Sequence, residues 1–218
     1  PKPEFIERAD AVLEAGGLLA VMKEEVARAR YPEFFRDAAK LEAEAVELHV
    51  YANQAVPGLL QTEEYARAVF GLLRPPLDEA IVNERVAARL ARQEIFHRAP
   101  HPLMSFVIDE SVLRRPIGGR DVLRGQLEQV LLVSHMRHVE VQVMPLNRDE
   151  NAGMAGPFTL IETKGERRIA YVEVQNVSRV HSDRESVRAL EAKYGTLRAQ
   201  ALTPRESVAY VEKLLGEL

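Results

Sequence analysis

Hydrophobic and polar positions follow two different periods along the first third of this chain. Between Phe5 and Ala45, apolar residues such as Leu18, Met22 and Val26 recur at helical spacing. The run Glu47-Leu48-His49-Val50-Tyr51 alternates with the period of two that is typical of a strand. We therefore expect a helical first segment that is followed by a short strand.

Two helices are predicted in the middle of the chain by their start signals. Thr62 is a good N-cap, and Glu63 and Glu64 would lie in the first turn, where the helix dipole favours acids. This helix should end at Pro75-Pro76, because proline interrupts helical hydrogen bonding. Asp78 then opens a longer helix that we expect to reach about Arg98.

Strand signals dominate from residue 103 onward. The apolar run Leu103–Ile108 predicts a buried strand, and Val139–Met144 predicts a second one. A helix that begins after Gly118-Gly119 should connect them. The segments Pro157–Thr163 and Arg168–Val174 flank a short turn and predict a β-hairpin.

The last part of the chain carries clear helix-capping signals. Ser182 with Glu185 reads as a capping box, and Thr203 with Glu206 reads as a second one with proline at the first helical position. Apolar residues of the first of these helices form one seam that should pack on a sheet or another helix: Val187, Leu190, Tyr194, Leu197 and Ala201.

These elements together predict an α+β fold. A helical N-terminal half precedes a small mixed β-sheet in the order β-α-β-β-β, with packed helices and two C-terminal helices. We expect two parts, a helical segment at residues 1–45 and an α+β binding domain at residues 46–218.

Composition and charge narrow the function classes. Hydrophobic residues make up 46% and charged residues 28% of the 218 residues, as in ordinary globular proteins. Cysteine is absent, which excludes disulfides, thiolate metal sites and cysteine nucleophiles. The net charge of −4 has no basic stripe, so we do not expect this chain to bind DNA by itself. No apolar run is long enough for a membrane span, and we expect a cytoplasmic protein.

Motifs for catalysis or metal binding are weak. His97 and His101 are separated by Pro100, and His135 with His138 is explained by a favourable interaction with a helix C-terminus. No nucleophile elbow and no phosphate-binding glycine loop is present. We therefore expect no metal, no cofactor and no catalytic residue.

One charged cluster is a candidate site for a ligand or partner. Asp109 and Glu110 end a buried strand, and Arg114 and Arg115 follow shortly after. Carboxylates and guanidinium groups at a strand end can bind a polar ligand or the charged side chains of another protein. The structural alternative is that Asp109 caps a turn and the arginines form exposed ion pairs.

Two further places could contribute to a binding surface. The small-residue loop Asn151–Pro157 leads into Phe158 and has the composition of a lid or of a simple strand connection. In Tyr171-Val172-Glu173, the tyrosine and the glutamate share one strand face, which lines a cleft or meets solvent.

The order of several motifs resembles a known family. Its most recognisable part is Val56-Pro57-Gly58-Leu59-Leu60-Gln61-Thr62 followed by Tyr65-Ala66-Arg67-Ala68. Further motifs follow in the family's order: Arg89-Leu90-Ala91-Arg92-Gln93, the Asp109 to Arg115 segment, Gly118-Gly119, Met144-Pro145 and Gly153 to Phe158. The chain is similar to the C-terminal regulatory domain of antitoxin-like transcriptional regulators of filamentous Gram-positive bacteria, in which a helix-turn-helix of the xenobiotic-response-element type precedes it.

This resemblance implies a domain that binds a small partner protein or a small-molecule effector, with DNA bound only by a helix-turn-helix upstream of Pro1. A homodimer is one expected assembly. The candidate binding residues are then Gln61, Arg92, Asp109, Glu110, Arg114, Arg115, Phe158, Tyr171 and Glu173. Two alternatives stay open: a small-molecule enzyme that uses Asp109, Glu110 or Glu173 as acid or base, and a purely structural dimerisation domain.

Overall fold

The computed structural model describes residues 12–13, 33–174 and 177–218. The chain divides into two compact units, residues 1–39 and residues 40–218. The predicted helical face at Leu18, Met22 and Val26 lies outside the described residues. Helix α3 (Glu33–Glu44) is followed directly by the first strand of the second unit, which carries the fold described below.

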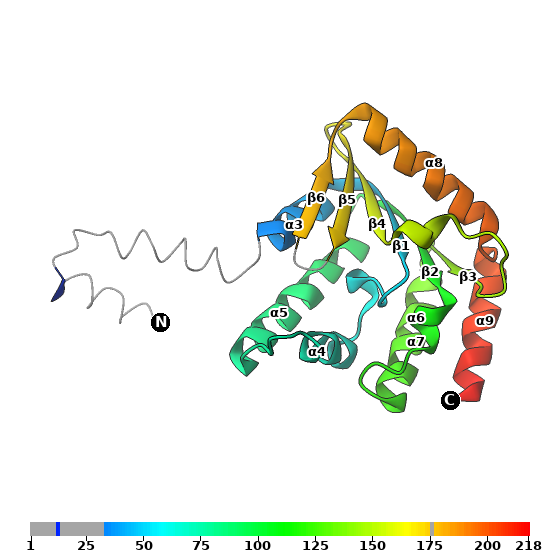
Figure 1. The fold of residues 1–218 in the computed structure, drawn as a ribbon, viewed down its shortest axis with the longest axis horizontal. Helices are drawn as coiled ribbons and strands as arrows, with labels where there is room; N and C mark the ends of the chain where they lie inside the picture. Colours follow the sequence, from blue (N-terminus) through cyan, green and yellow to red (C-terminus); the bar gives the residue numbers. More distant parts are fainter. Residues whose placement is uncertain (1–11, 14–32, 175–176) are drawn as a thin grey trace. The chain divides into compact units, whose positions relative to one another are not determined.

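A mixed β-sheet forms the centre of the second unit (Figure 1). Its strands occur in the spatial order β3-β2-β1-β4-β5-β6. Strands β1, β2 and β3 are parallel, whereas β4, β5 and β6 continue the sheet in antiparallel pairs. The strands are β1 (Ala45–Ala52), β2 (Leu103–Asp109), β3 (Val139–Met144), β4 (Phe158–Thr163), β5 (Arg168–Val174) and β6 (Val177–His181).

The α+β prediction is confirmed, with two additions to the expected sheet. The alternating run at residues 47–51 forms β1, which lies between β2 and β4 rather than outside the sheet. Strand β6 was not predicted. Parallel β2 is buried along nearly its whole length, because strands flank it and both its faces are covered. This explains why its sequence is apolar except for Ser105 and the final Asp109.

The helices agree with the predicted start signals, with two corrections. Thr203 forms the expected capping box, but the helix near residue 182 is capped by Asp183, whose carboxylate accepts from the Ser186 amide at 2.8 Å. The helix expected from Asp78 to Arg98 ends at Ala91, and a 3-10 turn continues it. The remaining elements are η1 (Gly58–Leu60), α4 (Glu63–Gly71), α5 (Glu79–Ala91), η2 (Arg92–Phe96), α6 (Glu110–Arg114), α7 (Arg120–Ser134), η3 (Ala152–Ala155), α8 (Arg184–Gln200) and α9 (Pro204–Glu217).

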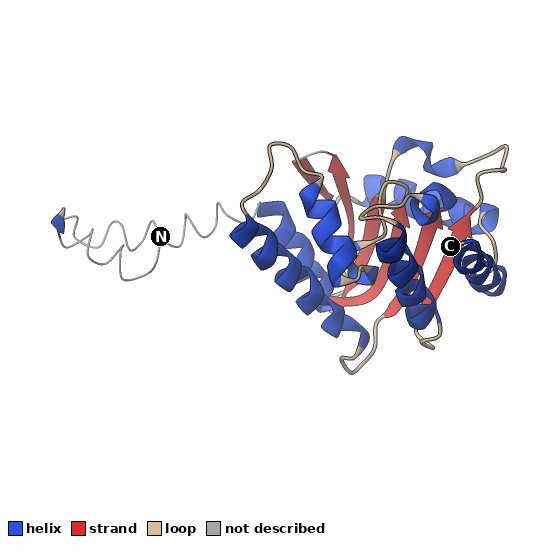
Figure 2. Cartoon of the chain, turned by 90° about the horizontal axis from the view of Figure 1, so that it is seen from below, coloured by secondary structure: helices blue, strands red, loops and turns tan. Residues whose placement is uncertain are grey.

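Each face of the sheet has its own hydrophobic core. On one face, Phe106 and Val141 pack with Tyr65 of α4, Leu127 of α7 and Val211 of α9. Several helices cross this side of the strands when the molecule is seen from below (Figure 2). The other core is covered by α8 and contains residues from five strands and the helix: Tyr51, Val107, Met144, Phe158, Leu160, Ala170, Val187, Tyr194 and Leu197. Alpha8 is therefore the main helical cover of the second face.

No helix in the described part of the chain combines the length and the apolar character that crossing a bilayer requires.

The histidines that contact each other are not those that are close in the sequence, since His138 contacts His101 instead of His135. His135 caps α7, and its Nδ1 lies 2.6 Å from the carbonyl of Leu131, as the helix-end interpretation predicts. His138 stacks on His101, with ring centroids 4.5 Å apart. Its pKa is lowered, first by desolvation and then by the neighbouring His101 and His97.

This lowered pKa predicts that the fold loses stability in mild acid. The folded state favours neutral His138, so the unfolded chain takes up the proton first below its ordinary pKa of about 6.5. Stability should therefore be fully present above that pH and fall as the pH drops towards the folded-state pKa. Urea unfolding at several pH values between neutrality and mild acid, with wild type and His138→Gln, measures this effect. An equal pH dependence in both proteins would refute it.

Candidate functional site

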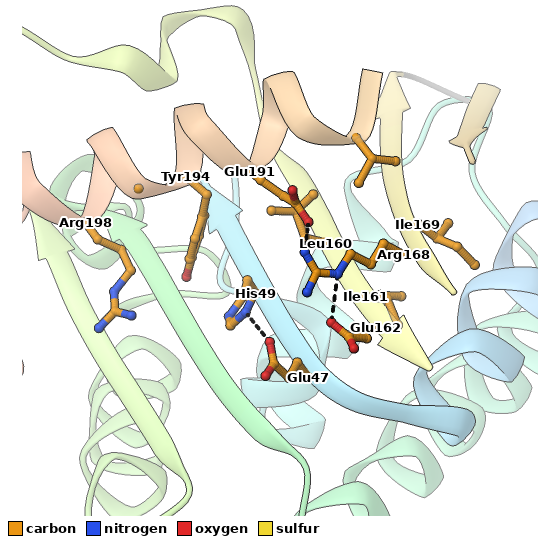
Figure 3. Close-up of a pocket in the computed structure, with 12 residues that line it drawn as sticks. Glu47, His49, Leu160, Ile161, Glu162, Arg168, Ile169, Glu191, Tyr194 and Arg198 are labelled. Carbon is orange, nitrogen blue, oxygen red and sulfur yellow. Dashed lines mark hydrogen bonds and ion pairs between the residues drawn. The ribbon is translucent and has the colours of Figure 1, made fainter. Parts of the chain in front are cut away.

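A cavity of about 260 Å³ lies between α8 and the sheet face formed by β1, β4 and β5 (Figure 3). Apolar wall is supplied by Leu160 and Val187. The ionisable lining residues, tyrosine apart, are Glu47, His49, Glu162, Arg168, Glu191 and Arg198. The cavity thus combines a hydrocarbon surface with charges of both signs, which is the composition of a site for a small polar molecule.

The local sequence explains why this space exists. In β1, Glu47 and His49 point to the α8 face because successive strand residues alternate between faces. Gly195 of α8 also lines the cavity, and a Cβ atom there would meet no other atom within 4 Å. A helix that packs on a sheet through Tyr194 and Leu197 therefore leaves an open volume at its glycine.

A hydrogen-bonded chain connects two lining residues of the cavity, His49 and Tyr194, through Ser105. His49 Nδ1 lies 2.7 Å from Ser105 Oγ, and Ser105 Oγ lies 2.9 Å from the Tyr194 hydroxyl. On its other side, His49 Nε2 is 3.4 Å from a carboxylate oxygen of Glu47. The His49 and Tyr194 rings stack, with centroids 5.3 Å apart and planes inclined by 29°. The imidazole is thus held from three sides.

This chain accommodates His49 in either protonation state. When His49 is neutral with its proton on Nε2, this N–H group donates a hydrogen bond to Glu47. Ser105 then donates to Nδ1, and Tyr194 donates to Ser105 Oγ. When His49 is protonated, Nδ1 donates to Ser105, whose hydroxyl donates to Tyr194. Tyr194 then donates to the Ser105 carbonyl, 3.0 Å away. Desolvation raises the pKa of Tyr194 above its usual value and keeps this hydroxyl protonated.

The order Glu47, His49, Ser105 is similar to that of a nucleophilic triad, but the position of the serine differs from what attack requires. Ser105 is 4% exposed and lies under the Tyr194 hydroxyl, outside the residues that line the cavity. A molecule in the cavity would meet Glu47 and His49 instead. The arrangement is suited to binding by Glu47 and His49.

Arginine side chains mark the two ends of the cavity. Arg168 Nε is 3.0 Å from Glu162, and its Nη1 is 3.3 Å from Glu191 (Figure 3). These carboxylates raise the pKa of the exposed Arg168 guanidinium. At the other end, Arg198 donates to the Gln142 side chain at 2.9 Å and also pairs with Glu140. Both guanidinium groups are therefore engaged by the protein itself.

The predicted acid and arginine cluster lies at the C-terminal end of β2, away from this cavity. Asp109 is 8% exposed and caps α6, accepting from the Ser111 amide at 3.0 Å. Arg115 donates to the carbonyl of Gln54 at 2.6 Å. These contacts agree with the structural alternative, in which Asp109 caps a turn, rather than with a ligand site.

Glu110 and Arg114 connect α6 to the end of the chain. They form an ion pair of 2.6 Å, and Arg114 also donates to the Tyr210 hydroxyl of α9 at 2.8 Å. The second Glu110 oxygen accepts from the Leu146 amide at 2.9 Å. The pKa of Glu110 is lowered by these hydrogen bonds, which outweigh its desolvation. This part of the cluster has a clear structural role in joining α6, α9 and the segment after β3.

Four other predicted residues come together on the opposite sheet face. Gln61 is 3% exposed and accepts from Arg89 at 2.7 Å. The Tyr171 hydroxyl donates to Glu173 at 3.4 Å, and the charges of Arg89 and Arg92 act on this carboxylate. Desolvation nevertheless raises the pKa of Glu173, and burial lowers that of Arg89 to about 10.

Arg92 completes this second polar cluster through a bidentate ion pair. Its Nε and Nη2 donate to the two carboxylate oxygens of Glu42 at 2.8 and 2.6 Å. Hydrogen bonds and nearby charges connect these four residues, of which Gln61 and Tyr171 are buried and Glu173 is exposed. The printed bonds join the turn after η1 to α5 and η2 to α3, and the charges of Arg89 and Arg92 act on β5.

Phe158 has a supporting position beside the cavity. It is 4% exposed, and its ring contacts Tyr194 edge-on with centroids 6.2 Å apart. It also lies 6.1 Å from the Tyr51 ring. Phe158 therefore holds the tyrosine that forms part of the cavity wall but is not itself a lining residue.

The sequence predictions missed the cavity residues, although a signal was present. Glu47 and His49 are two ionisable residues on one face of a strand that proved to be central. Glu191 and Arg198 flank the apolar seam of α8, and Gly195 follows its tyrosine. Polar residues beside an apolar seam usually contact solvent, so only the pairing of β1 with β4 and the position of α8 distinguish a cavity from a surface.

Replacing Gly195 by alanine should stabilise the domain by about 1 kcal/mol, because glycine inside a helix costs that much relative to alanine. The added methyl group meets open space. Gly216→Ala, near the end of α9, also adds a methyl group to open space and should give a smaller gain, since helix ends fray. Urea unfolding measures both. A loss of stability in Gly195→Ala would contradict the open space at α8.

A family model described as "Domain of unknown function (DUF5753)" matches residues 35–213. No curated protein and no solved structure matches the chain. Among the described residues, no cluster of three or more histidines and carboxylates has the arrangement of a metal site.

Proposed function

The chain belongs to the DUF5753 family, whose description assigns no activity, and from its structure we propose that it is the effector-binding domain of a bacterial transcriptional regulator. The single observation that carries the proposal is the cavity between α8 and the sheet. Its lining contains both charged groups and hydrocarbon. Such a composition selects a small polar molecule by orientation as well as by size.

The internal contacts of the cavity support binding rather than a purely structural role. Charged residues on an ordinary surface are solvated and need no fixed orientation. Glu47, His49 and Tyr194 are instead held in place around the cavity by contacts with one another and with Ser105. Preorganised polar groups reduce the entropy that a site loses when a ligand binds. The carboxylates on which the enzyme alternative relies, Asp109, Glu110 and Glu173, do not line this cavity.

The regulatory part of the proposal rests on the order of sequence motifs described above. We place DNA binding in a helix-turn-helix encoded upstream of this domain, because the net charge of −4 disfavours phosphate contacts by the domain itself. We also place the protein in the cytoplasm, where such a regulator reaches DNA. A ligand changes DNA affinity only when it binds two conformations of the regulator with different affinity.

Alpha8 is the element through which we propose that occupancy is transmitted. It forms one wall of the cavity and is joined to α9 by a short connection that begins at Ala201. Its Gln200 accepts from the Ala152 amide at 3.0 Å and thereby binds the loop after β3. A ligand that shifts α8 would shift both neighbours.

The proposal is tested with the full-length gene product and its operator DNA. We expect the dialysable fraction of the native cell lysate to change the DNA affinity of wild type by about tenfold, a coupling of ordinary size. Gly195→Leu, which adds a bulky side chain at a residue that lines the cavity, should lose this response. Gly125→Leu adds the same side chain in open space on α7 and should keep it.

Fluorescence anisotropy at fixed ionic strength measures these affinities. An equal response of Gly195→Leu and Gly125→Leu would contradict the assignment of the effector to this cavity, and binding of DNA without any response would contradict the regulatory role. Binding of a small partner protein stays a prediction, which co-purification would test. Formation of a homodimer also stays a prediction, which sedimentation would test.

A further inference from the structure

The distribution of charge in the cavity is uneven. Glu162 and Glu191 both pair with Arg168, at 3.0 and 3.3 Å. Glu47 lies beside Glu162, since the two are register partners on β1 and β4. Three carboxylates therefore surround a single guanidinium, and like charges opposite each other on neighbouring strands are unfavourable.

The second guanidinium does not correct this excess of negative charge. Arg198 is bound by Gln142 at 2.9 Å and by Glu140, a further carboxylate beside the cavity. Glu47 pairs with His49 at 3.4 Å, and this pair is ionic only when the imidazole is protonated. With His49 neutral, the cavity and its rim carry more carboxylates than cations.

The wall next to Glu47 is aromatic and apolar. The rings of His49 and Tyr194 stack on each other with centroids 5.3 Å apart, and Leu160 and Val187 line the same cavity. Aromatic faces attract organic cations as well as hydrocarbon. The volume of about 260 Å³ lies just below the roughly 300–1,000 Å³ that is usual for small-molecule pockets, so the ligand is small.

We propose that the cavity binds a small organic cation, an ammonium or guanidinium group on a short or flat hydrocarbon frame, with Glu47 as its counter-ion. The cation would occupy the place next to Glu47, and the hydrocarbon frame would lie against His49 and Tyr194. This assignment rests on the proposed function of the cavity as a binding site.

An anionic ligand fits the same contacts less well. It would have to displace Glu162 or Glu191 from Arg168, or Gln142 and Glu140 from Arg198, and would then lie beside the remaining carboxylates. A cation completes the charge balance without breaking any of these pairs. Electrostatic selection in this cavity therefore favours positive charge.

Three probes of nearly equal shape and different charge test the sign directly. Benzylamine, which is protonated at neutral pH, benzyl alcohol and benzoate are titrated into the protein at low salt, and amide resonances are followed by NMR. We expect benzylammonium to perturb residues 49, 194 and 195 and to bind more tightly than the other two. Its dissociation constant should rise about tenfold in Glu47→Gln, the size of one charged contact.

Glu212→Gln is the matched control, since Glu212 is an exposed carboxylate on α9, a helix that contributes no lining residue to the cavity. It should leave the affinity unchanged. If benzoate or benzyl alcohol binds at residues 49, 194 and 195 as tightly as benzylammonium, the cation assignment fails while the cavity remains a binding site. If no probe of any charge perturbs these residues, both the assignment and the proposed function of the cavity fail.

Discussion

Gln126→Ala should lower the free energy of unfolding by about 3–5 kcal/mol. Gln126 is fully buried on α7 and links this helix to the turn before α4. Its Nε2 donates to the Leu60 carbonyl at 2.7 Å, and its Oε1 accepts from the Thr62 amide at 3.0 Å. Alanine would leave both backbone groups buried without a partner and would create a cavity in addition.

Two further variants separate these causes. Gln126→Leu keeps most of the side-chain volume but makes neither hydrogen bond, so it should still be destabilised by about 2 kcal/mol or more. Gln129→Ala changes a partly exposed glutamine of the same helix and should stay within about 0.5 kcal/mol of wild type. Urea unfolding at one temperature compares them. Equal effects of Gln126→Ala and Gln129→Ala would show that the buried amide does not hold the turn.

Gly153→Ala is the second variant with a large expected effect, a loss of about 2–3 kcal/mol from overpacking. A Cβ atom at this position would lie 2.1 Å from Cζ of Tyr51. Tyr51 is 1% exposed and packs against Phe158, so it has little room to move. The clash would displace η3 from the sheet.

The control is Gly165→Ala in the hairpin turn, where a methyl group meets no atom within 4 Å. It should leave stability within about 0.5 kcal/mol of wild type. Tyr51→Phe combined with Gly153→Ala should not restore stability, since the ring carbon stays at the clash distance. Full stability of the single variant Gly153→Ala, measured by thermal unfolding, would contradict the close contact between η3 and β1.

The helices and most strands could be predicted because their signals are local. Thr203 capped its helix as expected, and the mostly apolar run of β2 indicated a buried strand. The position of β1 in the centre of the sheet could not be predicted, since strand order depends on pairing between segments far apart in the sequence. Asp183 replaced Ser182 as a cap because both residue types serve and only geometry selects between them.

The candidate site illustrates the same limit. Asp109 and Glu110 were selected because acids at a strand end often line clefts, yet one caps α6 and the other pairs with Arg114. Gln61, Arg92, Tyr171 and Glu173 do meet in space, but in a network that joins elements. His49 and Tyr194 are 145 residues apart in the sequence and become neighbours only when α8 packs on β1. A pattern within one segment of the sequence therefore cannot predict their contact.

We propose that the cavity beneath α8 binds a small molecule that is present in the cells that produce this protein. The most direct test of this claim is the thermal unfolding midpoint of wild type, Gly195→Leu and Gly125→Leu in the dialysable fraction of the native lysate and in plain buffer. A ligand at a hundred times its Kd stabilises by about 2.7 kcal/mol, a rise of about 5–10 °C for a domain of this size. We predict this rise for wild type and Gly125→Leu and none for Gly195→Leu. The same shift in all three proteins, or no shift in wild type, would contradict the claim.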